Sequence, residues 1–214
     1  MMKIDENIAL KTAEFLLQIK AIKLNPQEPF TWASGWKSPI YCDNRKTLSY
    51  PKIRNYLRQQ MTAYIQEEFG NVDVIAGVAT GGIALGALVA QDLGLPFVYV
   101  RSQSKAHGLE NKVEGVIESD QTVVVIEDLI STGGSSLKAV EALRNAGTNV
   151  KGMIAIFSYG FQVAEEAFEE AKCPVFILSD YNMMITKAIS DGYVKEEEAE
   201  MLSQWRLSPD TWGK

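Results

Sequence analysis

The chain has 214 residues, of which 46% are hydrophobic and 22% are charged. This composition is typical of one large globular domain and excludes a disordered, collagen-like or coiled-coil chain. Lysine and arginine number 21 against 27 aspartates and glutamates, and the resulting net charge of −6 argues against a general nucleic-acid binder, which is expected to carry a basic surface.

The two cysteines, Cys42 and Cys173, are too few for a disulfide framework and predict unpaired thiols in a reducing cytoplasm. The residues after Met1 do not form the apolar segment of a signal peptide, and the longest apolar stretches are far shorter than a membrane span. We therefore expect a soluble cytoplasmic protein with no membrane partner.

The first part of the chain combines helices with an irregular aromatic segment. Apolar residues at helical spacing predict a helix over residues 1–21. Residues 25–45 are rich in proline, glycine and aromatic side chains, with short β-like pieces at 30–32 and 40–42. Proline is favoured at a first helical position, so we expect a second helix from Pro51 to about Phe69.

From residue 72 onward, apolar strands alternate with helices. The expected strands are 72–78, 96–100, 122–126, 150–157 and 175–178, and the expected helices are 83–92, 135–145 and 163–171. Such alternation predicts a mostly parallel, doubly wound α/β sheet covered on both faces. Residues 181–214 predict two short helices and a tail.

Ligands of doubly wound sheets bind beyond the carboxyl ends of the strands. Three of these ends carry unusual residues, at 79–82, 101–108 and 127–135. In the third, the adjacent acids Glu127 and Asp128 follow a β-branched strand and precede a loop of hydroxyls and glycines that enters a helix. Backbone N–H groups of such a loop bind phosphate. The loop lacks the Gly-Lys-Ser/Thr of a Walker A motif.

A ribose 5-phosphate fits both halves of this motif. The acceptor-only carboxylates of Glu127 and Asp128 suit the 2- and 3-hydroxyls, or a metal, and residues 131–135 suit the phosphate. The alternative is a capped strand–helix turn whose acidic residues are stabilised by the helix dipole.

The acidic pair and its loop resemble the signature of the type I phosphoribosyltransferases, which bind 5-phosphoribosyl 1-diphosphate. Two further segments resemble the orotate-specific members of this family. Residues 31–43, TWASGWKSPIYCD, are similar to their N-terminal hood segment, and residues 101–108, RSQSKAHG, to their flexible catalytic loop. The resemblance extends over nearly the whole chain.

The resemblance implies one phosphoribosyltransferase domain over residues 1–214, with a core at about 51–180 and a small hood built from 1–50 and 181–214. It implies transfer of the phosphoribosyl group to N1 of orotate, giving orotidine 5-phosphate and pyrophosphate in pyrimidine (UMP) synthesis. The implied cofactor is Mg²⁺, held mainly by substrate oxygens and water instead of by protein side chains, with Asp128 as the one candidate protein ligand. The implied assembly is a homodimer in which the 101–108 loop serves the neighbouring subunit's site.

The resemblance also assigns roles to residues. The catalytic residues would be Lys105, His107 and Asp128. The sugar diphosphate would be bound by Thr80, Gly81, Arg101, Lys105, His107, Glu127, Asp128, Leu129, Ile130, Ser131, Thr132, Gly133, Gly134 and Ser135. Orotate would be bound by Lys37, Tyr41, Cys42 and Ser131.

Two departures from the family pattern bear on substrate contacts. Ser102, Gln103 and Ser104 stand where members commonly carry a further lysine, and Ser158-Tyr159 stand where some members carry an arginine for the orotate carboxylate. The alternatives are a phosphoribosyltransferase for purines or other bases, and a non-catalytic regulator that senses the sugar diphosphate. The aromatic residues of the hood segment predict either a lid over a planar base or ordinary core packing.

Overall fold

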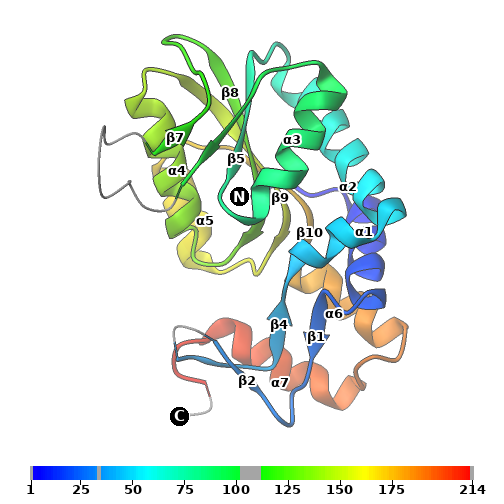
Figure 1. The fold of residues 1–214 in the computed structure, drawn as a ribbon. Helices are drawn as coiled ribbons and strands as arrows, with labels where there is room; N and C mark the ends of the chain where they lie inside the picture. Colours follow the sequence, from blue (N-terminus) through cyan, green and yellow to red (C-terminus); the bar gives the residue numbers. More distant parts are fainter. Residues whose placement is uncertain (1, 33–34, 102–111, 213–214) are drawn as a thin grey trace.

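The computed structural model describes residues 2–32, 35–101 and 112–212. Its centre is a sheet made of β5 (Val74–Val78), β6 (Phe97–Val100), β7 (Val113–Glu114), β8 (Thr122–Ile130), β9 (Asn149–Ser158) and β10 (Val175–Asp180). The strand order is β10–β9–β8–β5–β6–β7 (Figure 1). All neighbours are parallel except β7, which pairs antiparallel with β6. The predicted α/β fold with a mostly parallel sheet is confirmed.

Helices cover both faces of this sheet. The described helices are α1 (Glu6–Gln18), α2 (Pro51–Tyr64), α3 (Gly81–Leu93), α4 (Gly134–Asn145), α5 (Gln162–Glu170), α6 (Tyr181–Ser190) and α7 (Glu196–Leu207), and α7 lies away from the sheet (Figure 1). Figure 1 shows α1, α2 and α3 on one side of the sheet and α4 and α5 on the other. Successive strand side chains point to opposite faces. Accordingly Val124 and Ile126 belong to the core under α1–α3, whereas Val123 and Val125 belong to the core under α4 and α5.

The first helix is shorter than predicted. It begins at Glu6, because the Asp5 side chain accepts a hydrogen bond from the Ile8 N–H at 2.9 Å and caps the helix. Before it, Lys3 forms a parallel bridge with Phe176 of β10. The second helix reaches the expected end, since a π-helical turn over Ile65–Phe69 continues α2.

Strand β8 is longer than predicted, and this extension positions the acidic pair. Its pairing with β5 ends at Ile126, but its pairing with β9 continues to Ile130. Glu127 and Asp128 therefore lie within a strand instead of a loop after one. Beyond Ile126 one edge of β8 no longer has a strand beside it, because β5 gives way there to the start of α3.

Four short strands form two antiparallel pairs beyond the sheet. β1 (Ile22–Leu24) pairs with β4 (Ile40–Cys42), and β2 (Phe30–Thr31) pairs with β3 (Lys37–Ser38). We refer to β1–β4 and α7 as the hood; Figure 1 shows them together below the sheet. A 3-10 helix, η1 (Asn44–Ser49), connects the hood to α2. Helix α1, which the predicted hood includes, contacts both β10 of the sheet and α6. The predicted hood boundaries at residues 50 and 181 therefore stay a prediction. In the described part of the chain, no helix is long and apolar enough to cross a membrane.

Candidate functional site

A polar cavity of about 370 Å³ lies at the carboxyl ends of β5 and β8. It combines residues of the β5–α3 turn, the end of β8, the start of α4, and the end of β4 with the following η1: Cys42, Asp43, Arg45, Val78, Ala79, Thr80, Gly81, Glu127, Asp128, Leu129 and Ser135. We call it the first cavity. Six of the residues predicted to bind the sugar diphosphate, from two separate segments of the chain, meet in it.

The two acidic side chains reach this cavity from opposite faces of β8. Glu127 is buried, with 4% of its surface exposed. Its Oε2 accepts a hydrogen bond from Ser136 Oγ of α4 at 2.7 Å, and its Oε1 accepts one from the Asp128 N–H at 3.0 Å. The Asp128 carboxyl lies against Gly81 of α3, so closely that a Cβ on Gly81 would collide with it. The alternation of a β-strand thus separates two carboxyls that the sequence places side by side.

Burial changes the protonation of this pair. Burial raises the pKa of Glu127 to about 8, and the negative charge of Asp128 contributes to the same shift. Burial also raises the pKa of Asp128 above its usual range. Neighbouring buried carboxyls do not readily ionise together, and the more deeply buried Glu127 is the one that favours the protonated form.

The loop between β8 and α4 ends in a helix N-terminus that can bind an anion. Gly133 adopts a φ of +81° and precedes the first residue of α4. Thr132, Gly134 and Ser135 are exposed there, and the first N–H groups of a helix have no partner within it. Ile130 differs from the other predicted residues of this segment, because its side chain is buried in the core.

A second cavity of about 230 Å³ adjoins the first, and the two share Cys42 and Leu129. Its lining is Thr31, Trp32, Tyr41, Cys42, Leu129, Ser131 and Tyr159. Three of the four residues predicted to bind orotate line it, namely Tyr41, Cys42 and Ser131. Lys37 does not line it, but its ammonium group donates a hydrogen bond to Thr31 Oγ1 at 2.9 Å.

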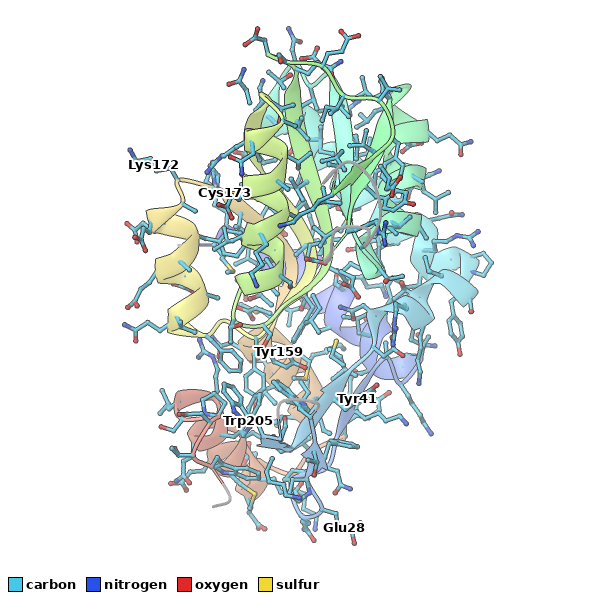
Figure 2. The ribbon with its side chains drawn as sticks, turned by 60° about the vertical axis from the view of Figure 1, so that its left-hand side comes forward. Glu28, Tyr41, Tyr159, Lys172, Cys173 and Trp205 are labelled. Atoms are coloured by element: carbon cyan, nitrogen blue, oxygen red, sulfur yellow. The ribbon has the colours of Figure 1, made fainter. Side chains whose placement is uncertain are left out.

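Aromatic rings support the second cavity from the hood side. The ring of Tyr159 lies 5.0 Å from that of Trp32 and 5.9 Å from that of Trp205 in α7. Figure 2 shows Tyr159 between the sheet and Trp205. Trp32 also donates from its indole N–H to the Ile40 carbonyl at 3.0 Å. Trp32 therefore packs against the core and also lines the second cavity, and a lid over a planar base stays a prediction.

Sequence reasoning missed the part that α7 plays. Arg206 donates to the main-chain carbonyls of Tyr159 at 3.3 Å and Gly160 at 2.9 Å, and to Asn182 Oδ1 at 3.1 Å. These contacts hold the segment that follows β9, and with it the Tyr159 wall of the second cavity. Only the aromatic and cationic character of Trp205-Arg206, in an otherwise acidic helix, could have indicated this role.

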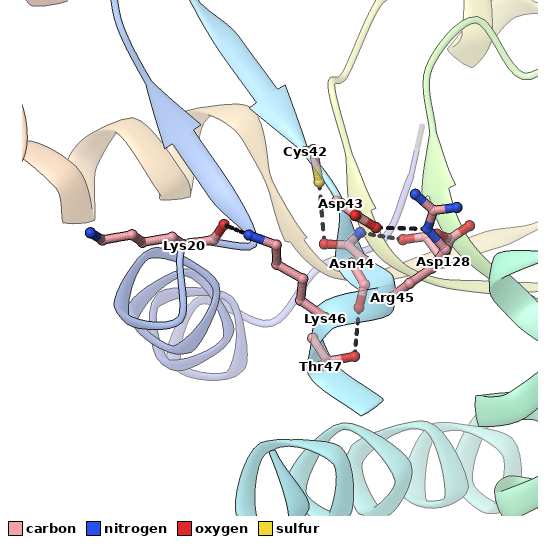
Figure 3. A network of polar contacts seen from close by, with 8 residues as sticks. All are labelled: Lys20, Cys42, Asp43, Asn44, Arg45, Lys46, Thr47 and Asp128. Carbon is pink, nitrogen blue, oxygen red and sulfur yellow. Dashed lines mark hydrogen bonds and ion pairs between the residues drawn. The ribbon is translucent and has the colours of Figure 1, made fainter. Parts of the chain in front are cut away.

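Sequence reasoning also missed a polar network at the start of η1 (Figure 3). Asn44 is buried; its side-chain amide donates to the Asp128 carbonyl at 2.6 Å and accepts a hydrogen bond from Cys42 Sγ at 3.2 Å. Asp43 forms an ion pair with Arg45 at 2.7 Å. Burial, followed by the charges of Asp128 and Asp43, raises the pKa of the Cys42 thiol well above its usual range, so this thiol is neutral and unsuited to act as a nucleophile.

The predicted catalytic loop begins at the end of β6. Arg101 Nη1 lies 3.3 Å from Glu114 Oε1 of β7, and its backbone N–H donates to the Lys112 carbonyl at 2.8 Å. Lys105 and His107, which we predicted to be catalytic, lie outside the described residues, as do Ser102, Gln103 and Ser104.

The donor set of the first cavity fits a substrate-held magnesium ion. Among the described residues, no group of three or more His, Cys, Asp or Glu side chains could hold a metal. Asp128 nevertheless offers a carboxylate at the cavity wall. Mg²⁺ commonly takes one or two carboxylates and completes its shell with water and substrate phosphates, and this site provides such a partial set.

Comparison with known proteins identifies the family. Residues 51–189 match the phosphoribosyl transferase domain. The chain is 60% identical to the orotate phosphoribosyltransferase of Porphyromonas gingivalis over 201 residues. This aligned region covers 94% of this chain and 96% of that protein. The chain belongs to the orotate phosphoribosyltransferase family.

Two further similarities agree with this family. The chain is 59% identical to the orotate phosphoribosyltransferase of Bacteroides thetaiotaomicron, over 97% of this chain and 98% of that protein. The crystal structure of orotate phosphoribosyltransferase from Aeropyrum pernix superposes with a TM-score of 0.72 at 26% identity, over 85% of this chain and 98% of that one. The resemblance inferred from the acidic pair, the hood segment and the loop is confirmed.

Proposed function

We propose that the chain transfers the phosphoribosyl group of 5-phosphoribosyl 1-diphosphate to N1 of orotate, giving orotidine 5-phosphate and pyrophosphate in pyrimidine synthesis. The observation that carries this proposal is the pair of adjoining cavities that share Cys42 and Leu129. One is polar, with three acids and two helix N-termini at its edge, and the other is lined largely by aromatic and apolar side chains. A charged sugar and a flat base need such a pair of neighbouring sites.

Each part of the sugar substrate has a matching group in the first cavity. The N-terminus of α4, with Ser131–Ser135, binds the 5-phosphate through N–H and hydroxyl donors. The Asp128 carboxylate accepts hydrogen bonds from the ribose hydroxyls. The turn at Thr80–Gly81, at the start of α3, presents N–H groups to the diphosphate.

The reaction is a displacement at the anomeric carbon, with orotate N1 as the nucleophile and pyrophosphate as the leaving group. The base lies in the second cavity against Tyr159 and Tyr41, and its N1 faces the first cavity at the Cys42–Leu129 junction. Positive charge develops on the ribose as the bond to the leaving group breaks, and the negative charge of Asp128 stabilises it. Asp128, together with substrate oxygens and water, would hold Mg²⁺, which would supply positive charge to neutralise the diphosphate.

The direct test is product formation by the purified protein. With Mg²⁺, orotate and 5-phosphoribosyl 1-diphosphate, the wild type should release orotidine 5-phosphate and pyrophosphate in equal amounts. Asp128→Asn should lower kcat/KM by the equivalent of about 1.5–3 kcal/mol, the value of a hydrogen bond to a charged group, while a melting experiment shows that it still folds. Normal turnover of a folded Asp128→Asn would show that Asp128 does not bind the ribose.

A cytoplasmic homodimer with the 101–108 loop acting on the partner's site is part of the same proposal. Lys105→Ala removes the loop's function and Asp128→Asn removes that of the cavity, so each homodimer should be nearly inactive. Mixed and re-equilibrated, the two variants should regain activity, because one site of each hybrid combines an intact loop with an intact cavity. Verified hybrids that stay inactive would show that the loop serves its own subunit.

A further inference from the structure

Arg45 is the one cationic side chain that lines the first cavity in the part of the chain that the structure describes. It belongs to η1, and 59% of its side-chain surface is exposed. The cavity is otherwise acidic, with Asp43, Glu127 and Asp128 in its wall. A sugar diphosphate carries several negative charges, which these carboxylates would repel without a cation among them.

The contact between Asp43 and Arg45 orients the guanidinium. Asp43 Oδ1 accepts a hydrogen bond from Arg45 Nε at 2.7 Å. This contact uses Nε and leaves both Nη groups for another acceptor. Exposed ion pairs contribute little to stability, so folding alone does not account for a pair set into the cavity wall.

The surroundings of η1 place Arg45 on the diphosphate side of the cavity. η1 packs against α3 and β8. The preceding residue, Asn44, is bonded to the Asp128 carbonyl at 2.6 Å. Figure 3 shows the Arg45 guanidinium on the same side as Asp128, and α3 begins with Gly81, against which the Asp128 carboxyl lies.

We propose that Arg45 binds the diphosphate group of the sugar substrate and that Asp43 is its positioning residue. The inference rests on the proposed function. The planar guanidinium donates two parallel hydrogen bonds to phosphate oxygens, which a lysine cannot do. Arg45 thereby supplies a cation to the diphosphate in a chain whose loop has Ser102, Gln103 and Ser104 where a further lysine is common.

Calorimetric binding with Mg²⁺ present tests this inference without requiring turnover. Inorganic pyrophosphate probes the diphosphate position and ribose 5-phosphate probes the other end of the cavity. Arg45→Gln should weaken pyrophosphate binding about tenfold or more, equivalent to about 1.4 kcal/mol, and leave ribose 5-phosphate binding unchanged. Arg45→Lys should keep only part of the wild-type affinity for pyrophosphate. Lys52→Gln removes an exposed charge from the first turn of α2 and should behave as wild type in both titrations.

Kinetics and a double variant complete the test. Arg45→Gln should raise KM for 5-phosphoribosyl 1-diphosphate about tenfold without a comparable change in KM for orotate. As a single substitution, Asp43→Asn should weaken pyrophosphate binding. Added to Arg45→Gln, it should weaken this binding little further, because a positioning residue acts through its partner. A folded Arg45→Gln that binds pyrophosphate normally, or that loses ribose 5-phosphate binding instead, overturns the proposal. If wild type forms no nucleotide from orotate, the proposed function fails, whereas the two binding titrations still decide the role of Arg45.

Discussion

The side-chain amide of Asn44 donates a 2.6 Å hydrogen bond to the main-chain carbonyl of Asp128, 84 positions later in the chain. This contact joins η1, which follows the hood strand β4, to the part of β8 that no longer pairs with β5. The hydrogen bond holds the Asp128 backbone where its carboxyl lies against Gly81. The position of the hood and the position of the acid are therefore linked through one buried side chain.

Asn44→Ala should lower both stability and substrate binding. It leaves the Asp128 carbonyl without its donor in a half-buried position, which should cost about 1–3 kcal/mol in the free energy of unfolding. KM for the sugar diphosphate should rise as well. The matched control is Asn149→Ala, since Asn149 donates to the Asp120 carbonyl at 3.2 Å in an exposed position at the opposite end of the sheet. Urea unfolding and steady-state kinetics on both variants check this, and an equal effect of the two on KM would contradict the link.

Glu127→Gln should remove a pH dependence of stability. Folded Glu127 keeps its proton up to about pH 8, whereas the unfolded side chain loses it near its ordinary value of 4.5. The folded state therefore binds more protons between these values, and the free energy of unfolding falls as pH rises through this window. Glutamine does not titrate, so the variant should lose this contribution. Urea unfolding from about pH 5.5 to about pH 8.5 compares the slopes; parallel curves would contradict the raised pKa.

Gly81→Ala should impair catalysis through Asp128. The added Cβ collides with the Asp128 carboxyl, so this side chain must move away from its position in the cavity. We expect kcat/KM to fall at least tenfold, equivalent to about 1.4 kcal/mol. Gly134→Ala is the folding control, because a Cβ there meets nothing within 4 Å. It should keep or slightly raise thermal stability, as alanine favours a helix over glycine by about 1 kcal/mol or less. A Gly81→Ala protein with full activity would show that Asp128 need not stay against α3.

Arg206→Ala should raise KM for orotate more than KM for the sugar diphosphate. It removes donors from the Tyr159 and Gly160 carbonyls, so Tyr159 loses its support in the wall of the second cavity. Arg144→Ala is the matched control, because Arg144 donates to the Ala171 and Lys172 carbonyls, outside both cavities. Each variant should lose about 1–3 kcal/mol of stability, but only Arg206→Ala should change KM for orotate. An unchanged KM for orotate in a folded Arg206→Ala variant would show that α7 does not support base binding.

The sequence allowed the fold class and the first cavity to be predicted, because each depends on local patterns. β-branched strands alternating with helices predict the parallel sheet, and the polar residues at two strand ends meet at one edge because parallel strands end together. The extension of β8 to Ile130 could not be read in the same way, since adjacent acids are rare in strands and the pairing with β9 supports them. Asn44 and Arg206 contact main-chain carbonyls 84 and 46 positions away, and Arg45 lines a cavity built from distant segments. No local sequence pattern marks such contacts.

The choice of base is the most direct test of the account. Wild-type protein would be given 5-phosphoribosyl 1-diphosphate and Mg²⁺ with orotate, uracil, adenine or hypoxanthine in turn, and kcat/KM would be measured for each base from pyrophosphate release. Orotate should be the preferred substrate by at least about a hundredfold, equivalent to about 2.7 kcal/mol of transition-state discrimination. Preferential turnover of a purine, or binding of the sugar diphosphate without nucleotide formation from any base, would contradict the account.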